Sequence, residues 1–255
     1  MDELGLLKGL VSIDSLSGAE AGVARYLSEA MAGLGYRVER DEVGNVVGEL
    51  GDVDSARHIV LLGHMDTVPG HIPVRVEDGR LYGRGTVDAK GPLAAFVWAA
   101  ARVGRKPLPV RLTVIGAVEE EGQSTGAHHL AETMAPPECV IIGEPGGWQG
   151  ITVGYKGTLR VIYRWVEAAR HAASGHGPPA ERAVAFWERV VSFGASTNLG
   201  RARRFETLDA HLLAIHTFGD GLEQGVEMTV GRYAMQVSAG PVETWAKART
   251  RRAPL

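Results

Sequence analysis

Hydrophobic residues recur at helical spacing in some stretches of the chain and form short unbroken runs in others. Helical spacing between residues 17 and 35, with Ser17 as a candidate N-cap, predicts an amphipathic helix. The unbroken runs predict strands, and a run without polar alternation is typical of a strand that is buried on both faces. The unbroken runs lie at 58–63, 110–118 and 139–142, whereas 36–40 and 46–50 are predicted as two short strands around a turn at 41–45. Further helices are predicted at 91–103 and 125–134.

The pattern changes after Gly157. Residues 158–166 alternate between apolar and polar positions, which predicts a half-exposed strand, and a helix at 180–193 and strands at 207–217 and 225–231 follow. We therefore expect an α/β fold with a central mixed, mostly parallel sheet and flanking helices, together with a smaller α+β lid domain. The predicted divisions are 1–157, 158–235 and a basic tail at 236–255.

Composition narrows the classes of protein that fit. Hydrophobic residues make up 45% and charged residues 22% of the 255 positions, as in a globular protein. With 27 Lys and Arg against 30 Asp and Glu, the chain lacks the basic excess expected of a nucleic-acid-binding protein. The longest apolar stretch, 93–101, is far shorter than the roughly 18–20 residues that span a bilayer. Because the sequence shows no signal-peptide pattern, we expect a cytoplasmic protein with no membrane partner.

The single cysteine, Cys139, lies in the apolar run 139–142. A lone cysteine has no partner for a disulfide within the chain, and free cysteines in apolar runs are often packed inside proteins. We expect Cys139 to be reduced and buried.

Acidic and histidine side chains follow three of the predicted strands. His64 and Asp66 come after the run 58–63, the triplet 119–121 ends the run 110–118, and Glu144 follows the run 139–142. Ligands gather at the carboxyl ends of parallel strands in α/β sheets, so we expect these side chains to meet. Crowded carboxylates repel one another unless a cation compensates them. One imidazole with several carboxylates suits Zn²⁺, Co²⁺ or Mn²⁺, and the pattern predicts metal-assisted hydrolysis.

Four ordered motifs carry a resemblance to a known family. The segments 63–69 (GHMDTVP), 82–91 (YGRGTVDAKG), 119–127 (EEEGQSTGA) and 143–145 (GEP) resemble the ArgE/DapE/carboxypeptidase family of co-catalytic zinc amidohydrolases. The resemblance implies two zinc ions, one held by His64, Asp88 and Glu144, and a second held by the bridging Asp88 and by Glu121. It also implies that Asp66 orients His64 and that Glu120 is the general base. A shift of these roles by one residue, toward Glu119, stays open.

Within that family, the sequences of segments 63–70, 87–93 and 154–158 resemble those of LysK-type enzymes of lysine and ornithine biosynthesis. Those enzymes release lysine or ornithine from a carrier protein by hydrolysing an amide at the γ-carboxyl of its C-terminal glutamate. The resemblance implies a metal-dependent amide hydrolase that acts on an acyl or carrier-protein-linked amide and forms a homodimer. The family's lid histidine, which stabilises the oxyanion in the neighbouring subunit, matches His171, with His176 as the alternative.

The resemblance covers roughly residues 1–235, and family members usually continue further, to a last histidine that completes the second metal site. From the sequence we therefore expect a truncated member of the family. One alternative is a truncated or diverged homologue that binds metal but is catalytically inactive. Another is an incomplete or frameshifted product.

Overall fold

The computed structural model describes residues 2–147, 149–150, 152, 156–169, 177–200 and 207–235. The chain divides into two compact units, the first within residues 1–149 and the second within residues 150–238. Each unit has its own sheet and its own hydrophobic core. No helix among the described residues has the length and apolar character that crossing a membrane requires.

The first unit contains a five-stranded sheet in the order β1-β2-β6-β3-β7. Strand β3 lies between β6 and β7 and runs parallel to both, whereas β1, β2 and β6 are joined by antiparallel pairing. The strand bounds are Arg37–Arg40 for β1, Val46–Gly51 for β2, His58–His64 for β3, Arg111–Ala117 for β6 and Cys139–Ile142 for β7. The unbroken apolar runs thus formed strands where the sequence predicted them.

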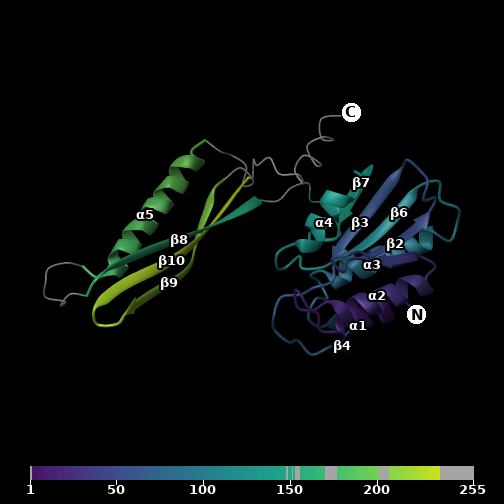
Figure 1. The fold of residues 1–255 in the computed structure, drawn as a ribbon, viewed down its shortest axis with the longest axis horizontal. Coiled ribbons are helices and arrows are strands. Elements are labelled where there is room, and N and C mark those ends of the chain that lie inside the picture. The colour runs from purple at the N-terminus through teal and green to yellow at the C-terminus, as the bar shows by residue number, and fades with distance from the viewer. Residues whose placement is uncertain are drawn as a thin grey trace. The chain divides into compact units, whose positions relative to one another are not determined.

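Helices cover both faces of this sheet (Figure 1). Helices α1 (Glu3–Val11), α2 (Ala21–Gly33) and α3 (Lys90–Val103) pack on one face. Helix α4 (Thr125–Thr133) packs on the other, where Leu130 contacts a second small cluster. The main core lies between α1–α3 and the sheet and includes the buried side chains of Leu6, Leu10, Leu27, Met31, Leu93, Val97 and Val114.

Helix α1 and the hairpin of β4 (Arg75–Glu77) and β5 (Arg80–Tyr82) were not predicted. Both contain residues that are typical of these elements, a helix cap in the first and a hairpin turn in the second. The Asp2 carboxylate accepts a hydrogen bond from the amide of Gly5 and so caps α1. Asp78 and Gly79 form the hairpin turn, and both have positive φ, as expected for an Asp-Gly pair.

Cys139 is exposed, and the expectation that it is buried was wrong. It begins β7, which pairs only with β3 among the described strands and forms an edge of the sheet. Ile141 and Ile142 of the same strand are also about half exposed. An apolar run therefore marked a strand correctly here, but not its burial.

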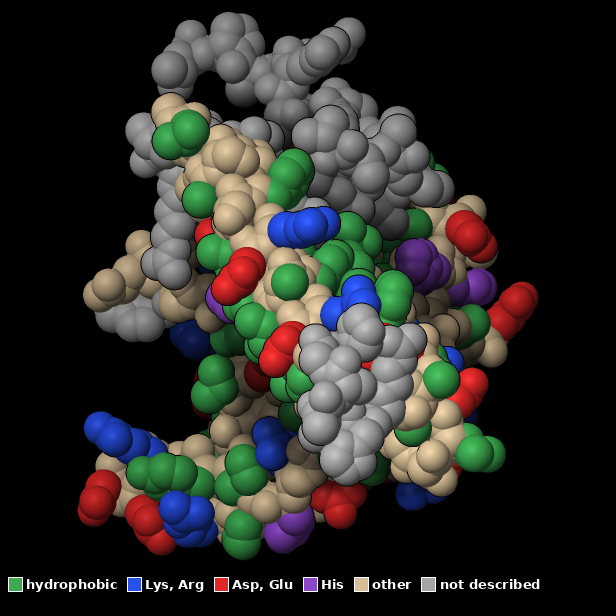
Figure 2. Space-filling model, turned by 90° about the vertical axis from the view of Figure 1, so that its left-hand side faces the viewer, with side chains coloured by type: hydrophobic (Ala, Val, Ile, Leu, Met, Phe, Trp, Pro, Cys, Tyr) green, Lys and Arg blue, Asp and Glu red, His purple; other side chains and the backbone are tan. Residues whose placement is uncertain are grey.

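The second unit is a three-stranded antiparallel sheet in the order β8-β10-β9, with one helix on one face. The bounds are Lys156–Ala168 for β8, Pro179–Asn198 for α5, Asp209–Gly219 for β9 and Glu223–Met235 for β10. Its core is small, with Ala183 of α5 packed against Val226, Met228 and Val230 of β10. Many apolar side chains of this unit stay at the surface, among them Ile162 and Phe218. Figure 2 shows hydrophobic side chains exposed among charged ones on the face in view. The predicted tail, 236–255, lies outside the described residues.

Candidate metal centre

Apart from Asp88, the side chains predicted to form the site come from the carboxyl ends of the three parallel strands. His64 is the last residue of β3, Glu120 and Glu121 follow β6, and Glu144 follows β7. Asp88 lies two residues before α3. Because β3 pairs in parallel with both neighbours, these chain segments emerge at one edge of the sheet.

His64 lies at the centre of this group. Its side chain is only 1% exposed, and its Nδ1 is 3.0 Å from the carbonyl oxygen and 3.2 Å from Oδ1 of Asp66. The other ring nitrogen, Nε2, faces three carboxylates. It lies 3.1 Å from Oδ1 of Asp88, 3.8 Å from Oε1 of Glu144 and 3.9 Å from Oε2 of Glu120.

Two sets of side chains each bring three ligand atoms within 4.8 Å of one another. One set is His64, Asp88 and Glu121, and the other is His64, Glu120 and Glu144. The structure therefore brings together all four residues predicted as ligands and the residue predicted as the base. The grouping differs from the prediction that His64, Asp88 and Glu144 hold one ion, because Glu120 takes the place of Asp88 in the set that contains Glu144.

The charges in this cluster shift the pKa values of its members. Burial lowers the pKa of His64, but the hydrogen bond with Asp66 and the charges of Glu120, Glu144 and Asp66 together raise it to about 9. Burial and the nearby carboxylates raise the pKa of Glu144 to about 6, although His64 acts in the opposite direction. Burial and the charge of Asp88 also raise the pKa of Glu121. An excess of carboxylates around one imidazole is the electrostatic setting that a divalent cation would relieve.

Asp66 is completely buried and connects His64 to the loop after β6. Its Oδ1 accepts a hydrogen bond from the amide of Glu120 at 3.1 Å, and its Oδ2 accepts one from the amide of Glu121 at 3.0 Å. Burial alone would raise the pKa of Asp66, but its hydrogen bonds, including those with His64 and Ser17, hold the pKa below its usual value. A carboxylate in this position fixes the orientation of the imidazole.

The structure separates Glu119 from the other members of the acidic triplet. The carboxylate of Glu119 accepts a hydrogen bond from the hydroxyl of Thr125, at the start of α4. Glu119 belongs to neither set of candidate ligands among the described residues. This geometry favours Glu120 and Glu121 over a register shifted toward Glu119.

Ser17 does not cap the helix that follows it. Helix α2 begins at Ala21 after Glu20, and the Ser17 hydroxyl instead donates a hydrogen bond of 2.7 Å to Oδ2 of Asp66. The local pattern predicted a cap because serine is common at that position, but a contact with a distant part of the chain uses the hydroxyl. The predicted lid histidine, His171, and its alternative, His176, lie outside the described residues.

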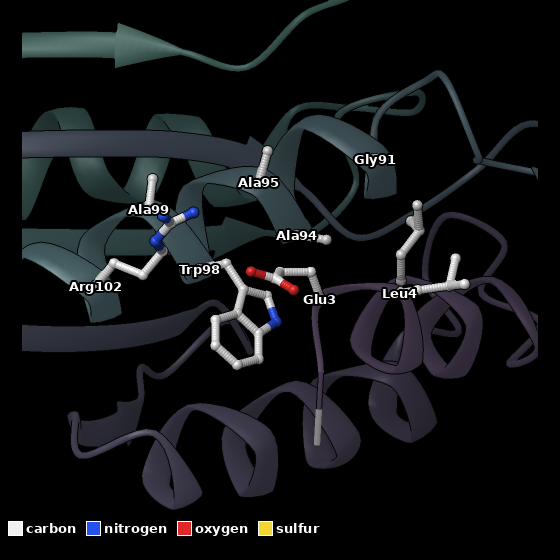
Figure 3. A pocket seen from close by; sticks show the side chains of 9 residues that line it. Glu3, Leu4, Gly91, Ala94, Ala95, Trp98, Ala99 and Arg102 are labelled. Atoms are coloured by element: carbon white, nitrogen blue, oxygen red, sulfur yellow. The ribbon is translucent and has the colours of Figure 1, made fainter.

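A groove of about 470 Å³ lies elsewhere in the first unit, between α1 and α3. Figure 3 shows that α3 lines it with small side chains such as Ala95 and Ala99, whereas Glu3 and Leu4 come from α1. Its lining contains no histidine and a single carboxylate, that of Glu3. The strand-end cluster, rather than this groove, is therefore the candidate functional site.

Comparison with known proteins identifies the family of the chain. The pattern of peptidase family M20/M25/M40 matches residues 60–250, which include all the candidate ligands. The chain belongs to this family. Membership in the M20 family confirms the family resemblance found in the sequence.

Relatives and solved structures extend this result. The chain is 40% identical over 231 residues to a protein of Deinococcus radiodurans named LysW-lysine hydrolase, covering 89% of this chain and 63% of that protein. It is 39% identical over 207 residues, covering 80% of this chain and 60% of the other, to a Pyrococcus furiosus protein provisionally named LysW-lysine/LysW-ornithine hydrolase. The chain thus spans about 60% of the length of these curated relatives.

The fold is shared with M20 proteins of known structure. The M20 metallo-carboxypeptidase Sso-CP2 of Sulfolobus solfataricus superposes with a TM-score of 0.68 at 17% identity, over 99% of this chain and 76% of that one. This similarity confirms the predicted α/β fold with a mixed, mostly parallel central sheet.

Proposed function

We propose that this protein is a metal-dependent amide hydrolase that releases lysine or ornithine from a carrier-protein-linked precursor. The observation that carries the proposal is the convergence of Asp88, Glu120 and Glu144 on Nε2 of one buried imidazole, that of His64. The names of two curated relatives, which refer to LysW-linked lysine or ornithine, support the substrate class.

The residues of the cluster fit a pair of divalent ions. One imidazole and four carboxylates offer nitrogen and oxygen ligands, and each candidate set already has its ligand atoms within 4.8 Å. Such a donor set suits Zn²⁺, with Co²⁺ or Mn²⁺ as alternatives. In our proposal, His64, Asp88, Glu121 and Glu144 hold the ions. Bound divalent ions would polarise the amide carbonyl and lower the pKa of the attacking water.

The remaining residues have roles that follow from their positions. Glu120 is 45% exposed in its side chain and therefore accessible to a substrate. It accepts the proton of the attacking water and then donates it to the amine nitrogen of the leaving lysine. Asp66 holds the ring of His64 through Nδ1, so that Nε2 points toward the carboxylates that would share the ion. The same proposal has three further parts. His171 stabilises the oxyanion, the second unit acts as a lid, and the protein forms a homodimer.

Lysine release from a short amide tests the function. The chain is stripped with a chelator, reloaded with zinc and incubated with lysine in amide linkage to the γ-carboxyl of glutamate, and free lysine is measured. We expect metal-dependent release, and we expect Glu120→Gln to slow it by about 10²–10⁴-fold, the usual contribution of a general base. Zinc binding by this variant should stay close to that of the unmodified chain.

The control variant is Glu138→Gln, because Glu138 pairs with Arg57 before β7 begins, at the other end of that strand from Glu144. It should hydrolyse the amide like the unmodified chain. Tight zinc binding without lysine release from either the short amide or the carrier-linked form would contradict the proposal and favour a metal-binding, inactive homologue.

A further inference from the structure

Residues 118–126 run from the end of β6 into the first turn of α4 and carry Glu120 and Glu121; we call them the glutamate loop. Its backbone includes two non-glycine residues in the left-handed region, Glu119 with φ of 56° and Ser124 with φ of 53°. L-residues with side chains rarely adopt this conformation, and it persists where the surroundings enforce it. Hydrogen bonds within the loop, from the amides of Gly122 and Ser124 to the carbonyl of Glu119, hold it together with contacts from outside the loop.

Four consecutive amides at the start of the loop each donate a hydrogen bond to a side chain from elsewhere in the chain. The acceptors are Asn45, Glu20 and Asp66, and the bonds are Val118 N to Asn45 Oδ1 at 3.0 Å, Glu119 N to Glu20 Oε1 at 3.0 Å, Glu120 N to Asp66 Oδ1 at 3.1 Å and Glu121 N to Asp66 Oδ2 at 3.0 Å. The side chains thus replace the neighbouring strand that would bind these amides in a sheet.

Asn45 holds both ends of the loop. Its side chain is completely buried, with Oδ1 accepting from the amide of Val118 and Nδ2 donating to the carbonyl of Gly126 at 3.1 Å. The same Nδ2 donates to Oδ2 of Asp41 at 2.7 Å, which fixes the amide in one orientation. Closing the loop at its two ends limits the directions in which its glutamates can point.

Glu20 binds the second of these four amides, that of Glu119. It lies just before α2 and is 6% exposed, and its Oε1 accepts hydrogen bonds from the amides of Gly18 and Glu119. Among the described residues, no lysine or arginine forms an ion pair with it. Two backbone amides therefore compensate the buried carboxylate of Glu20. Its role in the loop depends on the acceptor oxygen and not on an ion pair.

We propose that Glu20 and Asn45 are positioning residues of the metal centre. Among the described residues, neither forms a hydrogen bond with a candidate ligand side chain, yet both bind the backbone of the loop that carries Glu120 and Glu121. This inference rests on the proposed function, because it gives both residues a role only if the cluster binds metal.

The test is zinc titration by calorimetry on the full chain. Glu20→Met keeps the volume of the side chain and removes the acceptor, and we expect it to weaken zinc binding by about 10–100-fold, as loss of partners that support metal ligands does. Glu20→Gln keeps an acceptor oxygen and should bind zinc almost as tightly as the unmodified chain. If Glu20→Met does not fold, Glu20→Asp takes its place, since it keeps the charge but withdraws the carboxylate from the loop.

A matched control separates positioning from general stability. Thr113→Val removes the buried hydrogen bond between Thr113 and His58 in the same sheet, and should lower the melting temperature without changing zinc affinity. If Glu20→Met lowers the melting temperature but binds zinc like the unmodified chain, Glu20 is only structural and the inference is wrong. If the unmodified chain binds no zinc, the proposed function fails, and the inference fails with it.

Discussion

The hydroxyl of Ser17 donates a hydrogen bond of 2.7 Å to Oδ2 of Asp66, a side chain that is completely buried. The contact joins the segment before α2 to the residues just after β3. Together with the amides of Glu120 and Glu121, it occupies both carboxylate oxygens of Asp66. The carboxylate is thereby fixed in the orientation that contacts His64.

Replacing Ser17 with alanine should lower the stability of the fold. Removing one hydrogen bond to a charged, buried group is expected to reduce the free energy of unfolding by about 1.5–3 kcal/mol, measured by urea denaturation. The matched control is Ser28→Ala, which removes a local bond from the Ser28 hydroxyl to the carbonyl of Ala24 within α2. Equal effects of the two substitutions would show that the contact with Asp66 has no special importance.

The metal-free protein should lose stability as the pH rises. The pKa of His64 is about 9, above its usual value of 6.5, so the protonated ring stabilises the fold below pH 6.5 and this contribution is lost as the pH rises through 9. Glu144, with a pKa of about 6 instead of 4.5, acts in the same direction at lower pH. The measurement is the melting temperature in chelator between pH 6.5 and 9, compared with His64→Gln, which should show a flatter decrease.

Zinc should reverse this trend. A bound ion requires a deprotonated imidazole, so zinc affinity, and with it the stabilisation by zinc, increases with pH. We expect the increase in melting temperature caused by a fixed zinc concentration to be larger at pH 8 than at pH 6. A zinc effect that does not change with pH would argue against His64 as a ligand.

Gly126→Ala should destabilise the first unit. A Cβ at this position would lie 2.2 Å from Oδ1 of Asn45 and 2.7 Å from the carbonyl oxygen of Val118. Both groups are held by hydrogen bonds, so we expect a loss of about 1–3 kcal/mol, as for overpacking elsewhere. The control is Gly33→Ala at the end of α2, where nothing lies within 4 Å of the added Cβ. Thermal unfolding of the two variants should differ clearly, and equal stabilities would contradict the tight contact.

Cys139 should react in the native protein. Because it is exposed at the start of an edge strand, a thiol reagent such as Ellman's should modify it without denaturant. The expected result is one reactive thiol per chain, with the same rate in the presence of zinc, since Cys139 is not among the candidate ligands. Modification only after unfolding would mean that the thiol is buried.

The sequence predicted the parts of the fold that depend on local pattern. Strands β3 and β6 were predicted from unbroken apolar runs, and their parallel pairing placed His64 and the acidic triplet at one sheet edge, as expected. The order of strands in the sheet depends on contacts between distant segments. For that reason the position of Cys139 on an edge strand could not be predicted from its apolar neighbours.

The candidate site was predicted less completely than the fold. Residues that offer metal ligands stand out by their chemical type, so His64, Asp88 and Glu144 could be found from the sequence. Glu20 and Asn45 could not, because a glutamate or an asparagine near a turn is common and does not indicate a contact with a distant segment. Gly44 and Asn45 form a turn signal, and nothing in the sequence reveals that the amide of Asn45 is buried against the ends of another loop.

The hydrogen bonds of the four amides at residues 118–121 should also slow hydrogen exchange in this segment. Strand β6 ends at Ala117, but the amides of residues 118–121 all have side-chain acceptors, so slow exchange with solvent deuterium should continue past the end of the strand. A segment whose backbone is already ordered loses little conformational entropy when an ion arrives. The loop can then bind its cofactor as a rigid receptor, without folding around it.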